Sequence, residues 1–238
     1  MKKNGKWLAF GDIHDDTAFV DRLFDAERAN GIIVTGDITF NGGNKEAEGV
    51  LRALFGMAPG LYAQIGNMDR PEVDGLLSDK GCNLHARAVE ICPGVVVMGV
   101  GGSSPTPFGT PSEFTEAQLA HFLEQGYAQA RRLLDECASK GGRPLLVLVS
   151  HCPPYGTACD RLGGGGHAGS VAVRRFIEEA QPAFCVCGHI HEARAEEMLG
   201  KTRVVNPGDI GSGGYVVMQV TQGEKGPALD LALKVMDG

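Results

Sequence analysis

Five short apolar runs in this chain each end at a glycine or a serine, and a side chain that can bind a metal ion follows directly. The seven side chains of this pattern are Asp12, His14, Asp37, Asn67, His151, His189 and His191. In an open α/β sheet the functional loops lie at the carboxyl ends of the strands. A fold that makes strands of these runs therefore places metal-binding side chains where a functional site is expected.

The first third of the chain alternates between two kinds of segment. Apolar runs at 6–10, 32–35 and 61–65 predict strands, and the stretches near 17–29 and 44–57 predict helices. Strands at this spacing, with helices between them, are typical of βαβ units in a parallel sheet. Asp12, Asp37 and Asn67 would then follow three neighbouring strands.

The rest of the chain predicts more strands and one long helix. Thr115-x-x-Gln118 resembles a capping box and should open a helix that runs to about Ser139. The expected strands are 82–84, 89–92, 95–100, 145–150, 184–187 and 204–205, with a closing hairpin of 215–220 and 229–235. No linker or internal repeat interrupts the sequence, so we expect one domain over residues 1–238.

Composition restricts the classes of partner. The net charge of −7 and the lack of a basic stripe make nucleic acid an unlikely substrate. Seven scattered cysteines, with Cys185 and Cys187 inside an apolar run, indicate buried thiols rather than disulfides. The first apolar stretch is too short for a signal peptide or a membrane span, so we expect a cytoplasmic protein without membrane contact.

The ligand types indicate which metals would bind. Asp12 and His14 are two residues apart and share a face if the strand geometry continues through them, and the same holds for His189 and His191. One such pair alone is more often a solvated loop, but two pairs together with Asp37, Asn67 and His151 favour a metal site. Oxygen and imidazole ligands suit Mn, Fe, Ni, Co or Zn rather than calcium, and there are enough of them for two ions.

The strings that carry these ligands resemble those of a known superfamily, the calcineurin-like metallophosphoesterases, and in particular its small single-domain members from bacteria and archaea. The matching strings are Gly11-Asp12-Ile13-His14, Gly36-Asp37-Ile38, Gly66-Asn67-Met68-Asp69, Ser150-His151-Cys152-Pro153-Pro154 and Gly188-His189-Ile190-His191. The resemblance implies an α/β fold with mixed sheets, a four-layer αββα sandwich with a dinuclear metal site at the carboxyl ends of its strands.

The same resemblance implies a distribution of ligands and a reaction. One ion would take Asp12, His14 and His191, the other Asn67, His151 and His189, and Asp37 would bridge them. The expected reaction is attack of a metal-bridging hydroxide on a phosphodiester or an activated phosphomonoester, with a small phosphate ester as substrate. The alternative is a non-catalytic interaction protein on the same fold, as the retromer subunit of this superfamily illustrates.

Met68 departs from the pattern of the family. Members that act on many esters usually carry histidine after Gly-Asn, where it can protonate the leaving oxygen, and methionine has no proton to give. Loss of a general acid lowers the rate on the order of 10²–10⁴-fold for poor leaving groups. Either the protein hydrolyses a restricted set of diesters, which we favour because all seven ligands remain, or it has lost efficient catalysis.

The loop at 157–170 is where we expect a replacement for the missing acid. Its four consecutive glycines are followed by His167 and Ser170, which would lie near the start of the next helix, a place suited to phosphate. Arg161 could clamp a phosphate oxygen. We therefore expect substrate contacts from Arg161, His167 and Ser170, and catalysis by Asp37, Asn67 and His167. The alternative is a flexible surface loop.

Overall fold

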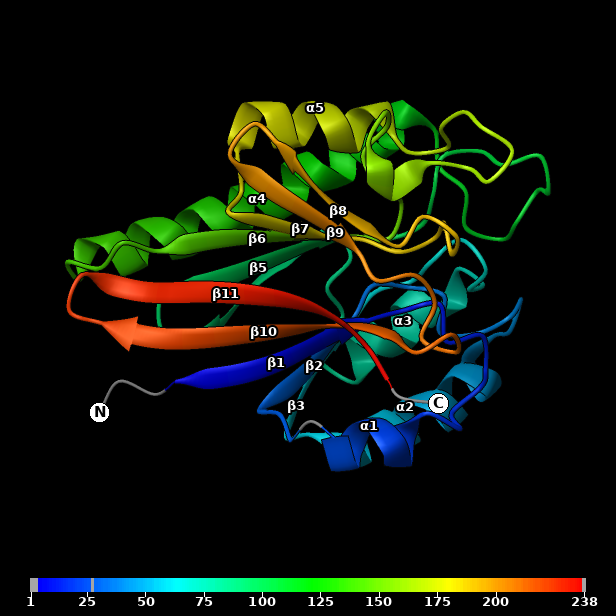
Figure 1. The fold of residues 1–238 in the computed structure, drawn as a ribbon, viewed down its shortest axis with the longest axis horizontal. Coiled ribbons are helices and arrows are strands. Elements are labelled where there is room, and N and C mark those ends of the chain that lie inside the picture. The colour runs from blue at the N-terminus through cyan, green and yellow to red at the C-terminus, as the bar shows by residue number, and fades with distance from the viewer. Residues whose placement is uncertain (1–3, 27, 237–238) are drawn as a thin grey trace.

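The computed structural model describes residues 4–26 and 28–236, and its first sheet has the strand order β11-β10-β1-β2-β3 (Figure 1). The bounds are β1 Gly5–Phe10, β2 Gly31–Val34, β3 Gly60–Ala63, β10 Gly214–Gly223 and β11 Gly226–Val235. Strands β1, β2 and β3 run parallel, as the βαβ pattern predicts, and the C-terminal hairpin joins β1 antiparallel.

The second sheet has the order β4-β5-β6-β7-β9-β8. The bounds are β4 Ala88–Cys92, β5 Val95–Val100, β6 Leu145–Ser150, β7 Phe184–Val186, β8 Ala195–Leu199 and β9 Thr202–Asn206. Four parallel strands form its centre, and β4 and β8 pair antiparallel at the two edges.

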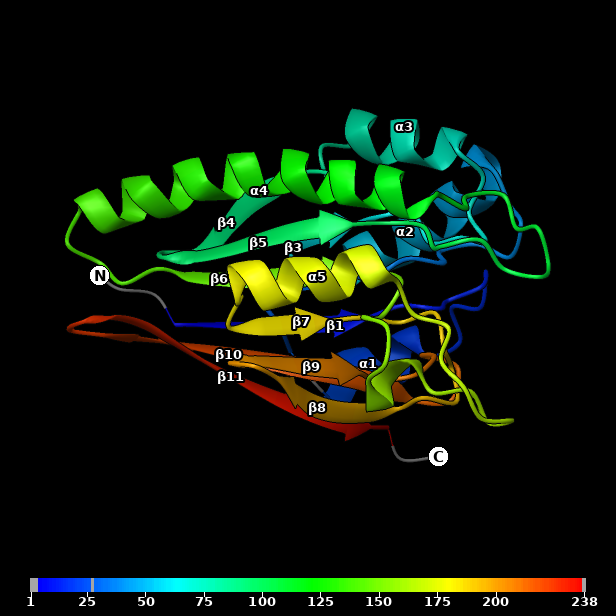
Figure 2. The same ribbon diagram turned by 90° about the horizontal axis from the view of Figure 1, so that it is seen from above.

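Helices cover the outer face of each sheet, and this gives the four-layer αββα sandwich that the resemblance implied (Figures 1 and 2). The helices are α1 Val20–Ala26, α2 Asn44–Met57, α3 Glu72–Asp79, α4 Glu116–Ser139 and α5 Val171–Ala180, with the short 3-10 helix η1 at Ala158–Asp160. Helices α1, α2 and α3 share an apolar core with the first sheet, and α4 and α5 share another with the second.

Strand β1 shows how the sequence produces these layers. Its side chains alternate, because successive residues of a strand point to opposite faces. Leu8 and Phe10 pack beneath the helices, whereas Trp7 and Ala9 enter the core between the two sheets. All four are buried, and full burial of a side chain such as Phe10 contributes roughly 1.5–3 kcal/mol.

Most of the elements predicted from the sequence are confirmed, with differences at some ends. Helix α4 begins as its capping box indicates, since Thr115 Oγ1 accepts from the Gln118 amide at 3.3 Å and Gln118 Oε1 accepts from the Thr115 amide at 2.9 Å. The predicted strand at 82–84 is wrong, because this segment makes only an isolated bridge between Ala63 and Asn83. The predicted helix at 17–29 is shorter, and residue 27 lies outside the described residues.

The two sheets share one buried core within the described residues, whereas the single domain expected over 1–238 includes residues beyond them and stays a prediction. Among the described helices, none is both long and apolar enough to cross a membrane.

Candidate metal centre

The loops that follow β1, β2, β3, β6 and β7 meet at one edge of the sandwich. Backbone hydrogen bonds join them: the Ile13 amide donates to the Asp37 carbonyl at 2.8 Å, and the Gly188 amide donates to the His151 carbonyl at 3.0 Å. The first bond links loops of the first sheet and the second links loops of the second sheet. The His189 amide donates to Asp12 Oδ1 at 3.1 Å, so the carboxyl ends of both sheets contribute to one site.

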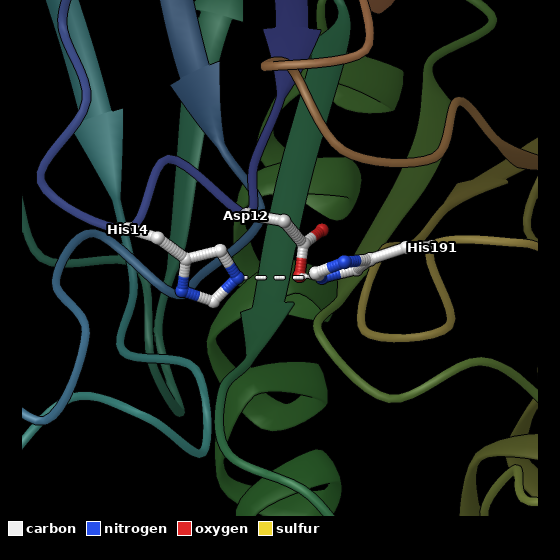
Figure 3. A group of neighbouring side chains, drawn as sticks. All are labelled: Asp12, His14 and His191. Atoms are coloured by element: carbon white, nitrogen blue, oxygen red, sulfur yellow. Dashed lines mark hydrogen bonds and ion pairs between the residues drawn. The ribbon is translucent and has the colours of Figure 1, made fainter.

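Asp12, His14 and His191 form the first group of candidate ligands. Figure 3 shows the three side chains pointing toward one another. The Nε2 atoms of His14 and His191 lie 3.3 Å apart, and His191 Nε2 lies 3.3 Å from Asp12 Oδ1. Their ligand atoms all lie within 4.8 Å of one another. His191 is far from the other two in the sequence, and the fold brings them together.

Asp37 connects this group to a second one. Its Oδ2 lies 3.9 Å from His14 Nε2, and its Oδ1 lies 3.4 Å from His151 Nε2. His151 Nε2 is also 2.9 Å from Asn67 Oδ1, and the rings of His151 and His189 have centroids 5.2 Å apart. Asp37 thus lies between the two groups, with one oxygen toward each.

The backbone of several candidate ligands has an uncommon conformation. Asp12, His14, Asp37 and His189 have φ angles of 54°, 50°, 49° and 69°. Residues other than glycine rarely adopt this left-handed backbone conformation, although Asp and His do so more readily than most. Such residues cluster at functional sites because the surrounding structure must hold them there. The shared conformation therefore supports a functional role for these loops.

Glycines beside the ligands permit the loops to approach closely. A Cβ on Gly66 would collide with the Asp37 carboxylate and its backbone nitrogen, and one on Gly188 would lie 2.5 Å from Asp12 Oδ2. Any larger residue at these two positions would push a carboxylate out of the site. These two glycines therefore allow the ligand loops to approach closely, in addition to allowing the chain to turn.

Asp69 braces two of the ligand loops. Its buried carboxylate accepts hydrogen bonds from the amides of Ile38, Thr39 and Gly66 at 3.1, 2.7 and 2.8 Å, and from the Thr39 hydroxyl at 2.8 Å. It thereby ties the loop that carries Asp37 to the loop that carries Asn67. These contacts give Asp69 the role of a supporting partner that orients the ligands.

The electrostatics of the site favour bound positive charge. Burial would raise the pKa of Asp37, but the imidazoles of His151 and His14 hold it below its ordinary value. Burial would lower the pKa of His151, yet the Asp37 carboxylate raises it to about 9. Burial and the imidazole of His151 lower the pKa of His189 to about 4. The Asp37 carboxylate thus favours a cationic His151, whereas burial and the charge on His151 favour a neutral His189.

These residues fit divalent metal ions. Ligand atoms bound about 2.0–2.2 Å from one ion lie about 3.0–3.5 Å apart, which matches the 3.3 Å distances from His191 Nε2 to His14 Nε2 and to Asp12 Oδ1. A carboxylate with one oxygen directed to each group is the arrangement expected of a bridge. The donors are oxygen and imidazole nitrogen, which suit first-row transition metals.

The nearby thiols are not placed as ligands. Cys152 and Cys187 are buried, and Cys187 Sγ contacts the Val205 carbonyl at 3.5 Å. Burial raises the pKa of the Cys152 thiol to about 12 and that of Cys187 far above its usual value, which disfavours the thiolate that a metal requires. As the sequence predicted, both side chains face the core.

An open cleft of about 1260 Å³ lies over the candidate ligands. His14, Asp37, Asn67, His189 and His191 line its floor. One wall is the segment 104–111, and the other includes parts of the loop 162–169. Two exposed aromatic side chains, Phe40 and Phe108, also line it, and no sequence pattern singled them out.

The structure separates the three expected substrate contacts. His167 lines the cleft, and Arg161 and Ser170 are not among the lining residues. Arg161 is exposed, whereas Ser170 is buried as the N-cap of α5, where its hydroxyl donates to Glu116 Oε2 at 2.8 Å. Substrate contact by Arg161 and Ser170 stays a prediction that this placement does not favour.

Comparison with known proteins identifies a family and similar proteins. A family model described as calcineurin-like phosphoesterase matches residues 5–193. The uncharacterized protein MJ1162 of Methanocaldococcus jannaschii is 34% identical over 211 residues, which cover 87% of this chain and 89% of that protein. The crystal structure of TT1561 of Thermus thermophilus is similar in fold, with a TM-score of 0.63, 18% identity, and coverage of 99% of this chain and 100% of that one.

Proposed function

Since the chain belongs to the calcineurin-like phosphoesterase family, we propose that it hydrolyses phosphodiesters or activated phosphomonoesters with the help of two divalent metal ions. The observation that carries the proposal is the position of Asp37, whose two carboxylate oxygens face the two groups of candidate ligands. A lone structural ion would not need a buried carboxylate shared between two clusters.

We assign the ligands as the family resemblance suggests. Asp12, His14 and His191 hold one ion, Asn67, His151 and His189 hold the other, and Asp37 bridges them. The contacts of Asp12 with His191 and of Asn67 with His151 support this division. Asp12 also accepts from the His189 amide at 3.1 Å, which couples the two sets through the backbone.

The bound ions would supply Lewis-acid stabilisation of the phosphate oxygens and lower the pKa of a water so that it attacks phosphorus. The chain contributes the rest. The amides around Asp37 and Asp69 keep the ligand loops fixed, and Phe40 and Phe108 add apolar surface to the cleft that would hold the ester. Manganese, iron, nickel, cobalt or zinc would suit this donor set.

The substrate is a small phosphate ester. The cleft is open and lined mainly by uncharged side chains, and the protein as a whole is acidic, which disfavours a nucleic-acid backbone. Met68 lines the cleft at the position where many family members carry a histidine, so this position provides no proton for the leaving oxygen. The seven free cysteines support the cytoplasmic location expected from the sequence.

Met68 also favours one alternative, a non-catalytic interaction protein that has kept the metal site. The test is metal analysis of the purified protein combined with turnover of bis(p-nitrophenyl) phosphate and p-nitrophenyl phosphate, with each candidate metal in turn. We expect two bound ions per chain and faster turnover of the diester. Bound metal without turnover of either ester would support the alternative.

Two variants sharpen this test. Asp37→Asn should lower kcat on the order of 100-fold or more, because the bridge loses its charge. His121→Gln is the matched control, since His121 lies exposed on α4 and contacts Gln125. Equal rates in these two variants would refute the assignment of Asp37.

A further inference from the structure

His167 is held by a buried carboxylate at the wall of the cleft. Its Nδ1 atom lies 2.7 Å from Asp160 Oδ1, and the Asp160 side chain is fully buried. The side chain of His167 is 35% exposed and lines the same cleft as the candidate metal ligands. A histidine with one nitrogen fixed by a buried carboxylate and the rest of its ring at a cleft is an arrangement that acid–base catalysis uses.

Hydrogen bonds hold both carboxylate oxygens of Asp160. Oδ1 also accepts from the Thr157 amide at 2.8 Å, and Oδ2 accepts from the amides of Gly156 and Gly169 at 3.0 and 2.9 Å. Three amide donors are directed at the two carboxylate oxygens, so this side chain acts as a hydrogen-bond acceptor. The carboxylate therefore requires a proton on Nδ1 of His167, which leaves Nε2 as the nitrogen that can exchange a proton with a ligand.

Backbone contacts within the glycine-rich loop fix the position of His167. Arg161 and His167 form a backbone bridge, the Leu162 amide donates to the Gly166 carbonyl at 3.2 Å, and the Ala168 amide donates to the Asp160 carbonyl at 3.2 Å. The four glycines form the tip of a hairpin-like turn, and the last two of them have positive φ angles. The turn places His167 directly beside the backbone that carries Asp160.

We propose that His167 is the general acid that protonates the leaving oxygen of the ester and that Asp160 is its positioning residue. The proposal rests on the proposed function. As the water oxygen bonds to phosphorus, the bond between phosphorus and the leaving oxygen breaks, and the proton on Nε2 of cationic His167 passes to that oxygen. Neutral His167 keeps the proton on Nδ1 with Asp160, and solvent restores the proton on Nε2.

Glu192 is the rival for this role. It is a titratable side chain of the same cleft outside the proposed ligands and His167, and its Oε1 accepts from the Gly163 amide at 3.4 Å. That single long bond to an exposed loop fixes it far less than Asp160 fixes His167. The structure therefore favours His167, and Glu192→Gln serves as the competing variant.

The test compares two diesters that differ in the leaving group, methyl p-nitrophenyl phosphate and methyl phenyl phosphate. The phenolate that leaves from the second is more basic and needs a proton more. In His167→Gln, kcat for the phenyl ester should fall on the order of 10²-fold or more, whereas the p-nitrophenyl ester should change by less than about threefold. His121→Gln should leave both rates unchanged.

Nitrogen-15 NMR of the histidine rings gives a readout that does not depend on turnover. Neutral His167 should carry its proton on Nδ1 in the native protein, and Asp160→Asn should give a mixture of tautomers, because the amide can either donate or accept. The melting temperature of Asp160→Asn shows whether this variant is folded, and the His167→Gln kinetics decide the question if it is not.

Each outcome separates the proposals. Equal losses for the two esters in His167→Gln, no loss for either, a neutral His167 with its proton on Nε2, or a selective loss in Glu192→Gln instead would overturn the role of His167. A native protein that turns over neither ester, with any of the metals, would overturn the proposed function and this inference together. Selective loss with the proton on Nδ1 would support both.

Discussion

The side-chain amide of Asn67 donates a hydrogen bond to Thr110 Oγ1 at 3.0 Å. Thr110 in turn donates its hydroxyl proton to Glu113 Oε1 at 2.7 Å, which leaves the hydroxyl oxygen free to accept from Asn67. This chain of bonds turns Asn67 Oδ1 toward His151 Nε2. A segment of the cleft wall thus sets which atom of the Asn67 amide faces the proposed metal site.

Thr110→Val should therefore weaken metal binding. Valine has nearly the same shape but cannot accept from the Asn67 amide, so the amide loses its orientation. We expect metal affinity to fall roughly 10–100-fold, the range typical for partners that orient metal ligands. Titration calorimetry with Mn²⁺ or Zn²⁺ measures this directly. Thr106→Val is the matched control, because Thr106 also donates to Glu113 but does not orient Asn67; equal losses in both variants would contradict the prediction.

Metal removal should destabilise the protein. Asp12 and Asp37 are buried carboxylates in one site, and bound cations offset their mutual repulsion. An ion present at 100 times its Kd adds about 2.7 kcal/mol to the free energy of unfolding. The melting temperature should thus fall on treatment with a chelator and recover on addition of metal. A native protein whose melting temperature is unaffected by either treatment would argue against a metal site.

Asp69→Asn should destabilise the protein even without metal. The new amide group cannot accept from all the backbone amides that now donate to Asp69, so at least one buried donor loses its partner. The expected loss is about 3 kcal/mol in the free energy of unfolding, measured in urea. Asp16→Asn is the comparison, since exposed Asp16 accepts a local bond from the Ala18 amide and should change stability by less than about 0.5 kcal/mol.

The positions of the ligands could be read from the sequence because each follows an apolar run that becomes a parallel strand. The ends of β1, β2 and β3 carry Asp12, Asp37 and Asn67 as predicted. The apolar pattern is strong where a strand is buried on both faces, and it is missing from a strand whose side chains are mostly exposed. Strand β8 could therefore not be predicted: its glutamates are exposed, and it lies at the edge of the sheet with a partner strand on one side only.

The contacts that support the site could not be predicted in the same way. Asp160 and His167 meet because a hairpin-like turn closes between them, and Thr110 meets Asn67 across 43 residues of chain. Neither pair has a spacing that a helix or strand would produce. Helix α3 was not predicted either, since it is short and its N-cap, Pro71, makes no side-chain bond. Such contacts depend on tertiary packing rather than on local pattern.

The buried thiols should resist alkylation in the folded protein. Burial raises the pKa of Cys82 to about 11 and that of Cys152 to about 12, so at pH 8 almost no thiolate is present at either. Iodoacetamide should modify both quickly in urea and very slowly in the native state, whereas half-buried Cys92 should react first. Mass spectrometry at timed intervals measures the rates, and native labelling of Cys152 as fast as in urea would contradict the burial.

Met68→His tests whether a histidine at position 68 can act as the general acid in place of His167. Met68 lines the cleft, and its amide donates to Asp37 Oδ1 at 2.7 Å, so its backbone is already fixed beside the proposed bridge. A histidine there would add an acid where many family members carry one. In a His167→Gln background we expect at least about a tenfold gain in kcat for methyl phenyl phosphate and little change for the p-nitrophenyl ester. In the native background the gain should be smaller, because His167 already supplies the proton.

Met68→Gln is the control, because glutamine is polar and of similar length but supplies no general acid. An equal gain with glutamine would mean that polarity rather than a proton limits the rate. No gain with histidine in the His167→Gln background would contradict the prediction, because it would mean that a side chain at position 68 has no access to the leaving oxygen. A gain in the native background as large as in the His167→Gln background would instead mean that His167 delivers no proton, and the leaving oxygen would then depend on solvent.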